Sequence, residues 1–189
     1  MLKVNEKQFM QILPTVMNNG GAVYVRPTMP LVHLGLENDI NEEYCLEHNI
    51  PIFKVERTGG AIVSNINDFD IIIVNKDLNK DVLPKLFYRL ICICNNKNLN
   101  FKMDKNDLLI DGRKVASYAY RMLKNGLTYL AMHLSMSVDL ELINNICKKE
   151  MLKVPGGLVD FGITDSEILT ILNSSDFIKN MCNNCGGNK

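Results

Sequence analysis

Hydrophobic residues change their spacing several times along the chain, and each spacing predicts a different element. Residues 5–17 carry apolar residues at the spacing of one helix face: Phe9, Ile12, Leu13 and Val16. Residues 127–138 instead alternate, as in a strand with one buried face: Leu130, Met132, Leu134 and Met136. Further helices are predicted over residues 41–48, 83–94, 139–149 and 166–179. Further strands are predicted over residues 22–25, 31–34, 50–55, 61–64, 71–74 and 114–121, with a hairpin of residues 101–102 and 108–110.

The order of these elements indicates the fold class. Residues 71–74 are apolar at every position, which predicts a strand at the centre of a sheet that is covered on both faces. Asp111-Gly112 is a strong signal for a tight hairpin turn, and Asp165 or Ser166 is a suitable N-cap for the last helix. Strands and helices alternate irregularly, with antiparallel hairpins among them. The sequence therefore predicts an α+β fold with a mixed, largely antiparallel sheet flanked by helices, rather than a doubly wound parallel sheet.

Composition narrows the class of protein without pointing to a function. The 189 residues suit a single domain over 1–189, with a polar, Gly-rich tail at 180–189 that we expect to be flexible. Lysine and arginine number 21, as do aspartate and glutamate, so the charge balance suggests neither nucleic acid nor an anionic membrane as the partner. The N-terminus lacks the apolar core of a signal peptide, and no stretch is apolar enough for a membrane helix. We therefore expect a cytoplasmic protein whose six cysteines are free thiols.

Three segments combine glycines with polar residues, as where a backbone approaches a ligand closely. Residues 55–63 form a predicted strand–turn–strand around a Gly-Gly pair, whose amides suit a phosphate or carboxylate, although a plain hairpin turn gives the same pattern. Residues 111–117 place Lys114 at the start of a strand, where an ammonium can polarise a phosphate or carbonyl, although most lysines are solvated surface groups. Residues 154–164 lead into the N-terminus of the last helix, which can receive an anion, although alone they read as a simple connection.

In this order and at these separations, the three segments resemble the biotin/lipoate protein ligase and octanoyltransferase superfamily. The most specific piece is Asp111-Gly112-Arg113-Lys114-Val115, which is similar to the lipoate ligase motif around the active-site lysine. Thr58-Gly59-Gly60 resembles the Ser/Thr-Gly-Gly core of the family's acyl- and nucleotide-binding loop. Leu31-Val32-His33-Leu34-Gly35 and Ser137-Val138-Asp139-Leu140 resemble its early strand and the strand end that follows the lysine. The similarity runs over residues 20–170 and is closest to the catalytic domain of lipoate–protein ligase.

The resemblance implies a fold like that of the class II aminoacyl-tRNA synthetases and the biotin/lipoate ligases. It implies an enzyme that forms an acyl-adenylate from lipoate or octanoate and ATP, with Mg²⁺, and then acylates a lysine. The implied acceptor is a lipoyl-domain protein, either a 2-oxoacid dehydrogenase E2 subunit or the glycine cleavage H protein, and a separate accessory ligase subunit is a further expected partner. Lys114 is the implied catalytic residue, and no metal ligand is expected among the side chains. The implied acyl- and adenylate-binding residues are Arg57, Thr58, Gly59, Gly60, Ala61, Asn65, Asp111, Gly112, Ser117, Gly156 and Gly157.

Several positions depart from the family's pattern and keep other functions open. Val55 and Glu56 stand where ligases usually have two arginines, and Asn65-Ile66 stands where His-Asp is common. One group of octanoyltransferases has a nucleophilic cysteine between the proline and glycine of the third segment, where this chain has Pro155-Gly156-Gly157. The nearest thiol, Cys147, lies on a predicted helix, which favours the adenylate-forming ligase over a thioester mechanism. The alternatives are an octanoyltransferase-like enzyme and a catalytically degenerate acyl- or adenylate-binding module that partners an active ligase.

The remaining candidate residues receive a structural interpretation. His33 and His133 lie on predicted strands, where packed and hydrogen-bonded histidines are more common than catalytic ones. Cys182 and Cys185 have the spacing of half a zinc site, but the sequence offers no matching second half. The sequence therefore predicts neither metal nor redox chemistry at these cysteines.

Overall fold

The computed structural model describes residues 1–34, 40–54, 61–79, 83–149 and 151–174. In chain order its elements are β1 (Leu2–Val4), α1 (Glu6–Asn19), β2 (Gly21–Val25), β3 (Leu31–Leu34), α2 (Glu42–Glu47), β4 (Ile52–Lys54), β5 (Ala61–Ser64), β6 (Phe69–Asn75), α3 (Lys85–Asn96), β7 (Phe101–Asp104), β8 (Asp107–Ile110), β9 (Arg113–Met122), β10 (Thr128–Leu134), α4 (Leu140–Ile146), the 3₁₀ helix η1 (Leu158–Phe161) and α5 (Asp165–Asn173). Within these residues, no helix has both the length and the apolar character needed to cross a membrane.

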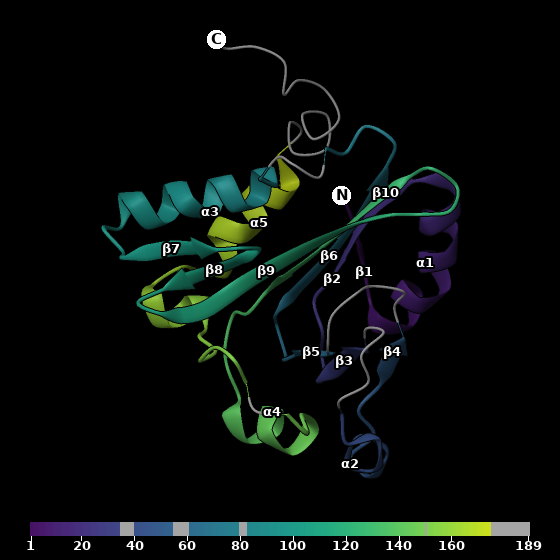
Figure 1. Ribbon diagram of the computed structural model, residues 1–189, viewed down its shortest axis with the longest axis horizontal. Coiled ribbons are helices and arrows are strands. Elements are labelled where there is room, and N and C mark those ends of the chain that lie inside the picture. The colour runs from purple at the N-terminus through teal and green to yellow at the C-terminus, as the bar shows by residue number, and fades with distance from the viewer. Residues whose placement is uncertain (35–39, 55–60, 80–82, 150, 175–189) are drawn as a thin grey trace.

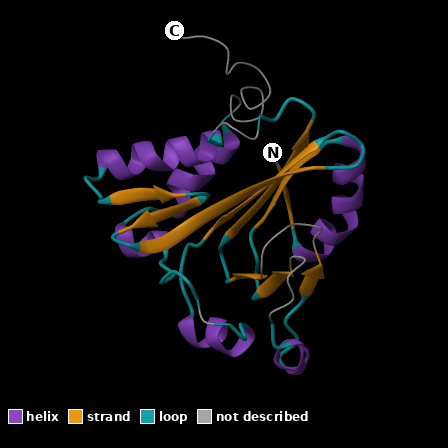
Figure 2. Ribbon diagram, viewed as in Figure 1, coloured by secondary structure: helices purple, strands orange, loops and turns teal. Residues whose placement is uncertain are grey.

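The described strands form two sheets, drawn as orange arrows in Figure 2. The large sheet has the order β1-β2-β6-β10-β9-β8-β7, and the small sheet has the order β4-β3-β5. In the large sheet, β1 pairs with β2 in parallel, and the other neighbours pair antiparallel. In the small sheet, β3 is parallel to β4 and antiparallel to β5. The predicted α+β fold with a mixed, largely antiparallel sheet is therefore confirmed.

Strand β6 lies near the middle of the large sheet and is buried along its whole apolar run. Ile71 and Ile73 pack into a core with α3 and α5, and Ile72 and Val74 pack into a second core with α1. Because successive side chains of a strand point to opposite faces, α1 covers the face opposite to α3 and α5 (Figure 1). Burying one such side chain stabilises the fold by roughly 1.5–3 kcal/mol. The prediction that this strand is central is confirmed.

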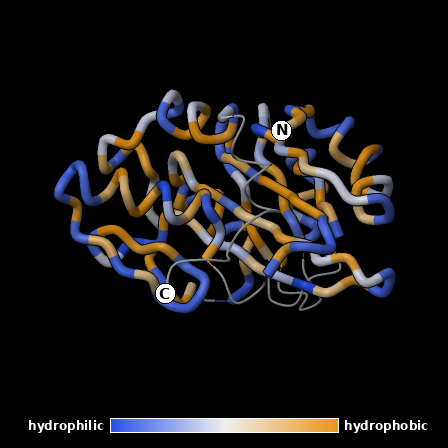
Figure 3. The backbone as a smooth tube through the Cα atoms, turned by 90° about the horizontal axis from the view of Figure 1, so that it is seen from above, coloured by the Kyte–Doolittle hydropathy of each residue, from blue (hydrophilic) through white to orange (hydrophobic). Residues whose placement is uncertain are grey.

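The small sheet packs with helices at one end of the molecule. Val32 of β3 shares a third core with Cys45 of α2 and Ile146 of α4. The helices α2 and α4 also contact each other. Figure 3 shows hydrophobic stretches running through the middle of the molecule and hydrophilic stretches concentrated at its outer turns. The small sheet therefore has a core of its own and packs beside the large sheet.

Some element boundaries differ from the sequence-based expectations. The strand predicted over 127–138 ends at Leu134, because beyond it Met136 N donates to the Asp68 carboxylate instead of continuing the ladder. The N-cap of α5 is Thr164, which accepts from Glu167 N in a capping box, so the assignment of the cap to Asp165 or Ser166 was wrong. β1 was not predicted, since a three-residue strand is too short to show a period.

Candidate functional site

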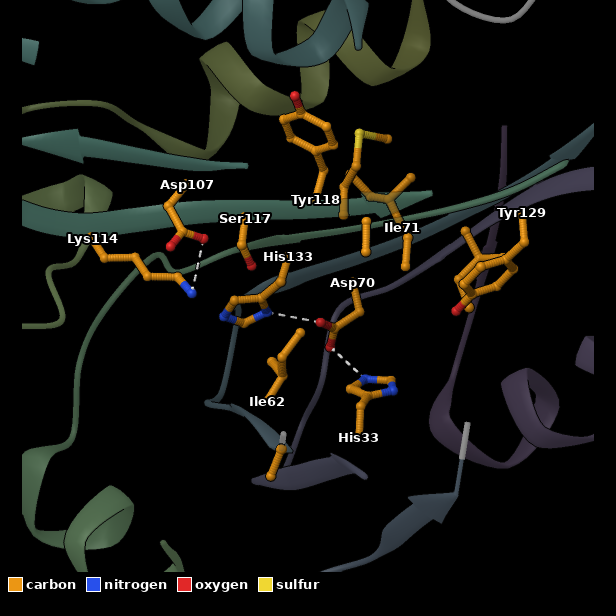
Figure 4. Close-up of a pocket in the computed structure, with 15 residues that line it drawn as sticks. His33, Ile62, Asp70, Ile71, Asp107, Lys114, Ser117, Tyr118, Tyr129 and His133 are labelled. Atoms are coloured by element: carbon orange, nitrogen blue, oxygen red, sulfur yellow. Dashed lines mark hydrogen bonds and ion pairs between the residues drawn. The ribbon is translucent and has the colours of Figure 1, made fainter. Parts of the chain in front are cut away.

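The large and small sheets enclose two adjoining cavities. They have volumes of about 270 Å³ and 560 Å³. Both are lined by Ala61, Ile62, Asp107, Lys114, Ser117 and His133. The first cavity continues along mainly apolar residues of the sheets: Ile72, Ala119, Tyr129 and Ala131. The second opens past Cys147, Lys153 and Pro155. Figure 4 shows the first cavity, with Ile62 and His33 projecting from the small sheet toward the large one.

A row of polar residues crosses the large sheet along these cavities. Asp70 of β6 is the register partner of His133 on β10, and His133 is the partner of Ser117 on β9. Ser117 is in turn the partner of Asp107 on β8. Register partners present their side chains on the same face, so residues far apart in the sequence form one polar band across four neighbouring strands.

Lys114 joins this band because β9 contains an irregularity. Leu108 pairs with Ala116 and Leu109 pairs with Lys114, so Val115 is an extra residue in β9. Val115 and Ala116 are therefore both buried in the core beneath α3 and α5. Regular alternation would place Lys114 and Ser117, three residues apart, on opposite faces. The bulge turns Lys114 to the face of Ser117, as bulges commonly re-aim a side chain at a site.

The tight turn before β9 and the third glycine segment hold Lys114 in place. Asp111 and Gly112 both have positive φ, 47° and 76°, which is the hairpin geometry that their sequence predicted. The backbone of Lys114 is clamped from the other side, since Lys114 N donates to Val154 O and Gly156 N donates to Lys114 O, each at 2.8 Å. The second and third segments are thus neighbours in space.

Gly156 and Gly157 allow this close approach between backbones. A Cβ atom on Gly156 would lie 2.8 Å from Arg113 Cβ, and one on Gly157 would lie 2.7 Å from Met136 O. Real Cβ atoms do not approach other atoms so closely, so any side chain would push the segment away from β9. In the structure these glycines serve packing next to Lys114, and neither lines a cavity.

Lys114 shares a carboxylate with a second lysine. Lys114 Nζ lies 3.1 Å from Asp107 Oδ1, and Lys153 Nζ lies 2.6 Å from Asp107 Oδ2. Lys153 also contacts Asp104 Oδ2 at 2.8 Å, and hydrogen bonds to both carboxylates raise its pKa. The side chain of Lys114 is 35% exposed, so its ammonium remains accessible from the cavities. The wider second cavity is lined by four lysines, including Lys114 and Lys153, and by two aspartates, so its lining carries a net positive charge that favours an anionic ligand.

Buried ionisable groups lie deeper in the first cavity. His133 Nδ1 donates to Asp70 Oδ1 at 2.8 Å, and His33 Nε2 lies 3.1 Å from Asp70 Oδ2 (Figure 4). Ser64 Oγ is 3.4 Å from His133 Nδ1. Asp68 Oδ2 is 3.8 Å from His133 Nε2, which is longer than a hydrogen bond. The two histidines are buried and hydrogen-bonded or paired, as the sequence interpretation held.

Two opposing effects set the pKa values of this cluster. Burial disfavours the charged form of each group, and nearby opposite charges favour it. Burial raises the pKa of Asp68 to about 6, against the attraction of His133. Burial alone would also raise the pKa of Asp70, but His33 and His133 hold it well below its ordinary range. Burial alone would lower the pKa of His133, but the hydrogen bond to Asp70 and the charges of Asp70 and Asp68 raise it. Asp70 is therefore ionised at neutral pH and fixes the Nδ1–H tautomer of His133.

The structure brings only some of the sequence-predicted site residues to the cavities. Lys114, Ser117 and Ala61 line both cavities. Asp111 and Gly112 lie in the exposed turn, and neither borders a cavity. Asn65 also borders neither, but its backbone N–H donates to Asp68 Oδ2 at 2.8 Å. The remaining predicted residues lie outside the described part of the chain: Arg57, Thr58, Gly59 and Gly60.

Sequence reasoning missed Asp70 and Asp107, and it considered Cys147 only as a thiol on a predicted helix away from the site. Asp70 carried a signal, since an aspartate inside an apolar strand is expected to be paired when buried. Asp107 carried none, and the place of Cys147 at the second cavity could not be predicted either, because each reaches the cavities only through tertiary packing. Across the described residues, no group of three or more His, Cys, Asp or Glu is arranged to hold a metal ion. The cavities therefore combine an accessible ammonium, a buried imidazole and an apolar channel.

Comparison with known proteins places this arrangement in context. Residues 30–183 match the family model of the lipoyl protein ligase A/B catalytic domain. A search of curated proteins found no match. Among solved structures, LipL1 of P. falciparum in complex with lipoate is 15% identical with a TM-score of 0.65. The match covers 91% of this chain and 52% of that one, so this chain spans about half the length of LipL1.

Two further solved structures are similar in fold. A lipoate-protein ligase A bound with ATP is 14% identical over 95% of this chain and 84% of that chain, with a TM-score of 0.67. A bi-partite lipoate protein ligase from Thermoplasma acidophilum, described together with its E2 lipoyl domain, is 14% identical over 95% and 82% of the two chains, with a TM-score of 0.63. At these identities the likeness shows the shared fold.

Proposed function

The chain belongs to the family of the lipoyl protein ligase A/B catalytic domain, and from this we propose that it attaches a lipoyl or octanoyl group to a lysine of another protein through an acyl-adenylate made from ATP. The observation that carries the proposal is the position of Lys114. Its ammonium stands where the apolar first cavity meets the wider second one. An acyl chain in the first cavity would therefore present its carboxyl group to a cation.

The physical task of Lys114 follows from this position. Its ammonium binds the acyl carboxylate and the phosphate that will carry it, which holds the two reactants together. In the second step the same charge stabilises the oxyanion that forms when the acceptor amine attacks. Asp107 and the backbone bonds to Val154 and Gly156 hold the lysine in place before either step. The segment at 55–60 keeps its proposed role in binding the acyl group and nucleotide.

The similar structures support the choice of co-substrate and acceptor. One similar ligase is bound with ATP, and another is described with an E2 lipoyl domain. We propose ATP as the co-substrate, with Mg²⁺ held mainly by phosphate oxygens and water. The proposed acceptor is a lipoyl domain of an E2 subunit or a glycine cleavage H protein, with a separate accessory ligase subunit as a further partner. A cytoplasmic location stays a separate proposal, which the similar structures do not address.

A thioester mechanism is a second candidate, because Cys147 lines the second cavity together with Lys114. In that mechanism the thiolate of Cys147 would accept an octanoyl group from acyl carrier protein before passing it to the acceptor. The two functions differ in their need for ATP.

The test measures pyrophosphate release by the purified chain with ATP and lipoate, octanoate or biotin, each offered separately. We expect release with lipoate or octanoate and none with biotin. Pyrophosphate release with none of the three acids, in a protein that melts cooperatively, contradicts the proposal.

A further inference from the structure

The proposed reaction requires a group that removes a proton from the acceptor amine. A lysine amine has a pKa near 10.4, so at neutral pH only about one in 2,500 is unprotonated and nucleophilic. Lys114 cannot accept this proton, because its task requires the charged ammonium. A proton acceptor beside the acyl carbonyl would make the abundant ammonium form of the acceptor usable.

His133 is placed to be that acceptor. It lines both cavities beside Lys114 and Ser117, and its side chain is 10% exposed. Its Nδ1–H donates a hydrogen bond to Asp70, so in the neutral ring Nε2 carries the free lone pair and can accept a proton. Figure 4 shows the ring nitrogen opposite to the Asp70 contact turned toward the side of the cavity where Lys114 lies. An aspartate that fixes the tautomer of a histidine base is an arrangement known from hydrolases.

We infer that the Asp70–His133 pair is the general base that deprotonates the acceptor lysine, with His133 as the catalytic residue and Asp70 as a positioning residue. This inference rests on the proposed acyl transfer. Lys114 and His133 then have different roles at the same acyl carbonyl group. The ammonium faces the oxygen on which charge develops, and the imidazole takes the proton that the attacking nitrogen loses.

In acyl transfer from the adenylate to the acceptor lysine, two protons leave the attacking nitrogen. His133 Nε2 takes one proton from the acceptor ammonium, and the freed electron pair forms the C–N bond to the acyl carbon while the carbonyl π electrons move to oxygen. These electrons return, and the C–O bond to the phosphate breaks with its pair leaving on AMP. The amide nitrogen loses its second proton to water. The products are the acylated lysine, AMP and two protons, one of them on His133 until water removes it.

The charges around His133 set the pH range of this base. Asp70 and Asp68 of the β6 region raise its pKa, and Lys114 of β9 opposes them. Asp107 of β8 pairs with Lys114 and weakens that opposition. Ser64 of β5 is uncharged, and His33 of β3 contacts the far oxygen of Asp70. Because the pKa is raised and the base must be neutral, the rate should rise with pH through a value above 6.5 and then level off.

The experiment supplies preformed lipoyl-adenylate to the purified chain and compares two nucleophiles, a lysine amide and hydroxylamine. Hydroxylamine is already neutral at pH 7 and needs no base. We expect His133→Gln to slow transfer to the lysine amide by about 10²-fold or more and to leave transfer to hydroxylamine nearly unchanged. His48→Gln is the matched control, because His48 is exposed and lines neither cavity. The ratio of the two rates is measured within one sample, so partial unfolding of a variant cancels.

The wild-type pH profile gives a second, independent readout. With the base, transfer to the lysine amide levels off above the raised pKa of His133. Without it, the rate follows the free amine and rises about tenfold per pH unit toward the amine's own pKa. Asp70→Asn should move the plateau to lower pH, because it removes the charge that raises the pKa of His133.

Equal losses with both nucleophiles in His133→Gln, or a wild-type profile without a plateau, would overturn the role of His133 and leave the proposed function intact. A wild-type protein that transfers the acyl group to neither nucleophile would instead refute the proposed function itself.

Discussion

Replacement of Lys114 by alanine separates the chemical role of this residue from its structural one. The change removes the ammonium that lies 3.1 Å from Asp107 Oδ1 at the junction of the cavities. Loss of one preorganised donor to a developing oxyanion typically lowers a rate by about 10²–10³-fold, or roughly 2.7–4 kcal/mol of transition-state stabilisation. In adenylate formation the same ammonium holds the carboxylate and the phosphate together, and loss of this clamp should lower the rate of that step by about 10²-fold or more as well.

Folding stability should change little in the same variant. The ion pair is half-exposed, with side chains that are 35% and 18% accessible, and pairs of this kind contribute no more than about 1 kcal/mol. Asp107 also keeps its contact with Lys153 at 2.6 Å, so the substitution leaves no unpaired carboxylate behind. Lys114→Arg should restore stability but little activity, because a planar guanidinium does not replace a compact ammonium.

The assay follows adenylate formation and thermal unfolding for wild type, both Lys114 variants and a control. Lys97→Ala is a matched control, because Lys97 Nζ lies 3.2 Å from Glu167 Oε1 with both side chains 33% exposed, and neither residue lines a cavity. We expect wild-type activity in the control. Equal activity in wild type and Lys114→Ala would refute the assignment, and a melting temperature lowered by many degrees would show that the residue is structural.

Two further variants test the neighbouring segments. Gly157→Ala should destabilise the protein by roughly 1–3 kcal/mol, since its Cβ would lie 2.7 Å from Met136 O, and it should lower activity by moving the segment that holds Lys114. Val159→Ala, at an exposed position, is the control in thermal melts. An unchanged melting temperature for Gly157→Ala would contradict the packing argument. Cys147→Ser should retain ATP-dependent acyl transfer if the adenylate is the intermediate, whereas loss of transfer together with an acyl thioester on Cys147 in wild type, detected by mass spectrometry, would favour the octanoyltransferase mechanism.

Local patterns allowed the elements and one motif to be predicted. The face of α1 with Phe9 and Val16, the apolar run of β6 and the turn before β9 each depend on residues within a few positions of one another. Their physical causes are helix and strand periodicity and the tolerance of Asp-Gly for positive φ. Lys114 could be proposed as the catalytic residue because its contiguous motif resembles that of the lipoate ligases.

The rest of the site depends on pairings between distant residues. Asp70, Asp107, Ser117 and His133 form one row only because four strands pair in a particular register, and a slip of one residue would turn a whole strand over. The glycines at 156 and 157 could be found in the sequence, but their closeness to Arg113 and to the 136 carbonyl could not.

The amino-acid sequence by itself determined the helices, most strands and the α+β class, because these follow from short-range spacing, and Lys114 was singled out by the resemblance of its motif to the ligase family. Tertiary structure decided which way that lysine faces. The extra residue Val115 in β9 places Lys114 and Ser117 on one face, although their separation of three would put them on opposite faces of a regular strand. The same bulge places Val115 and Ala116 together in the core beneath α3 and α5, and this packing joins elements that are distant in the chain.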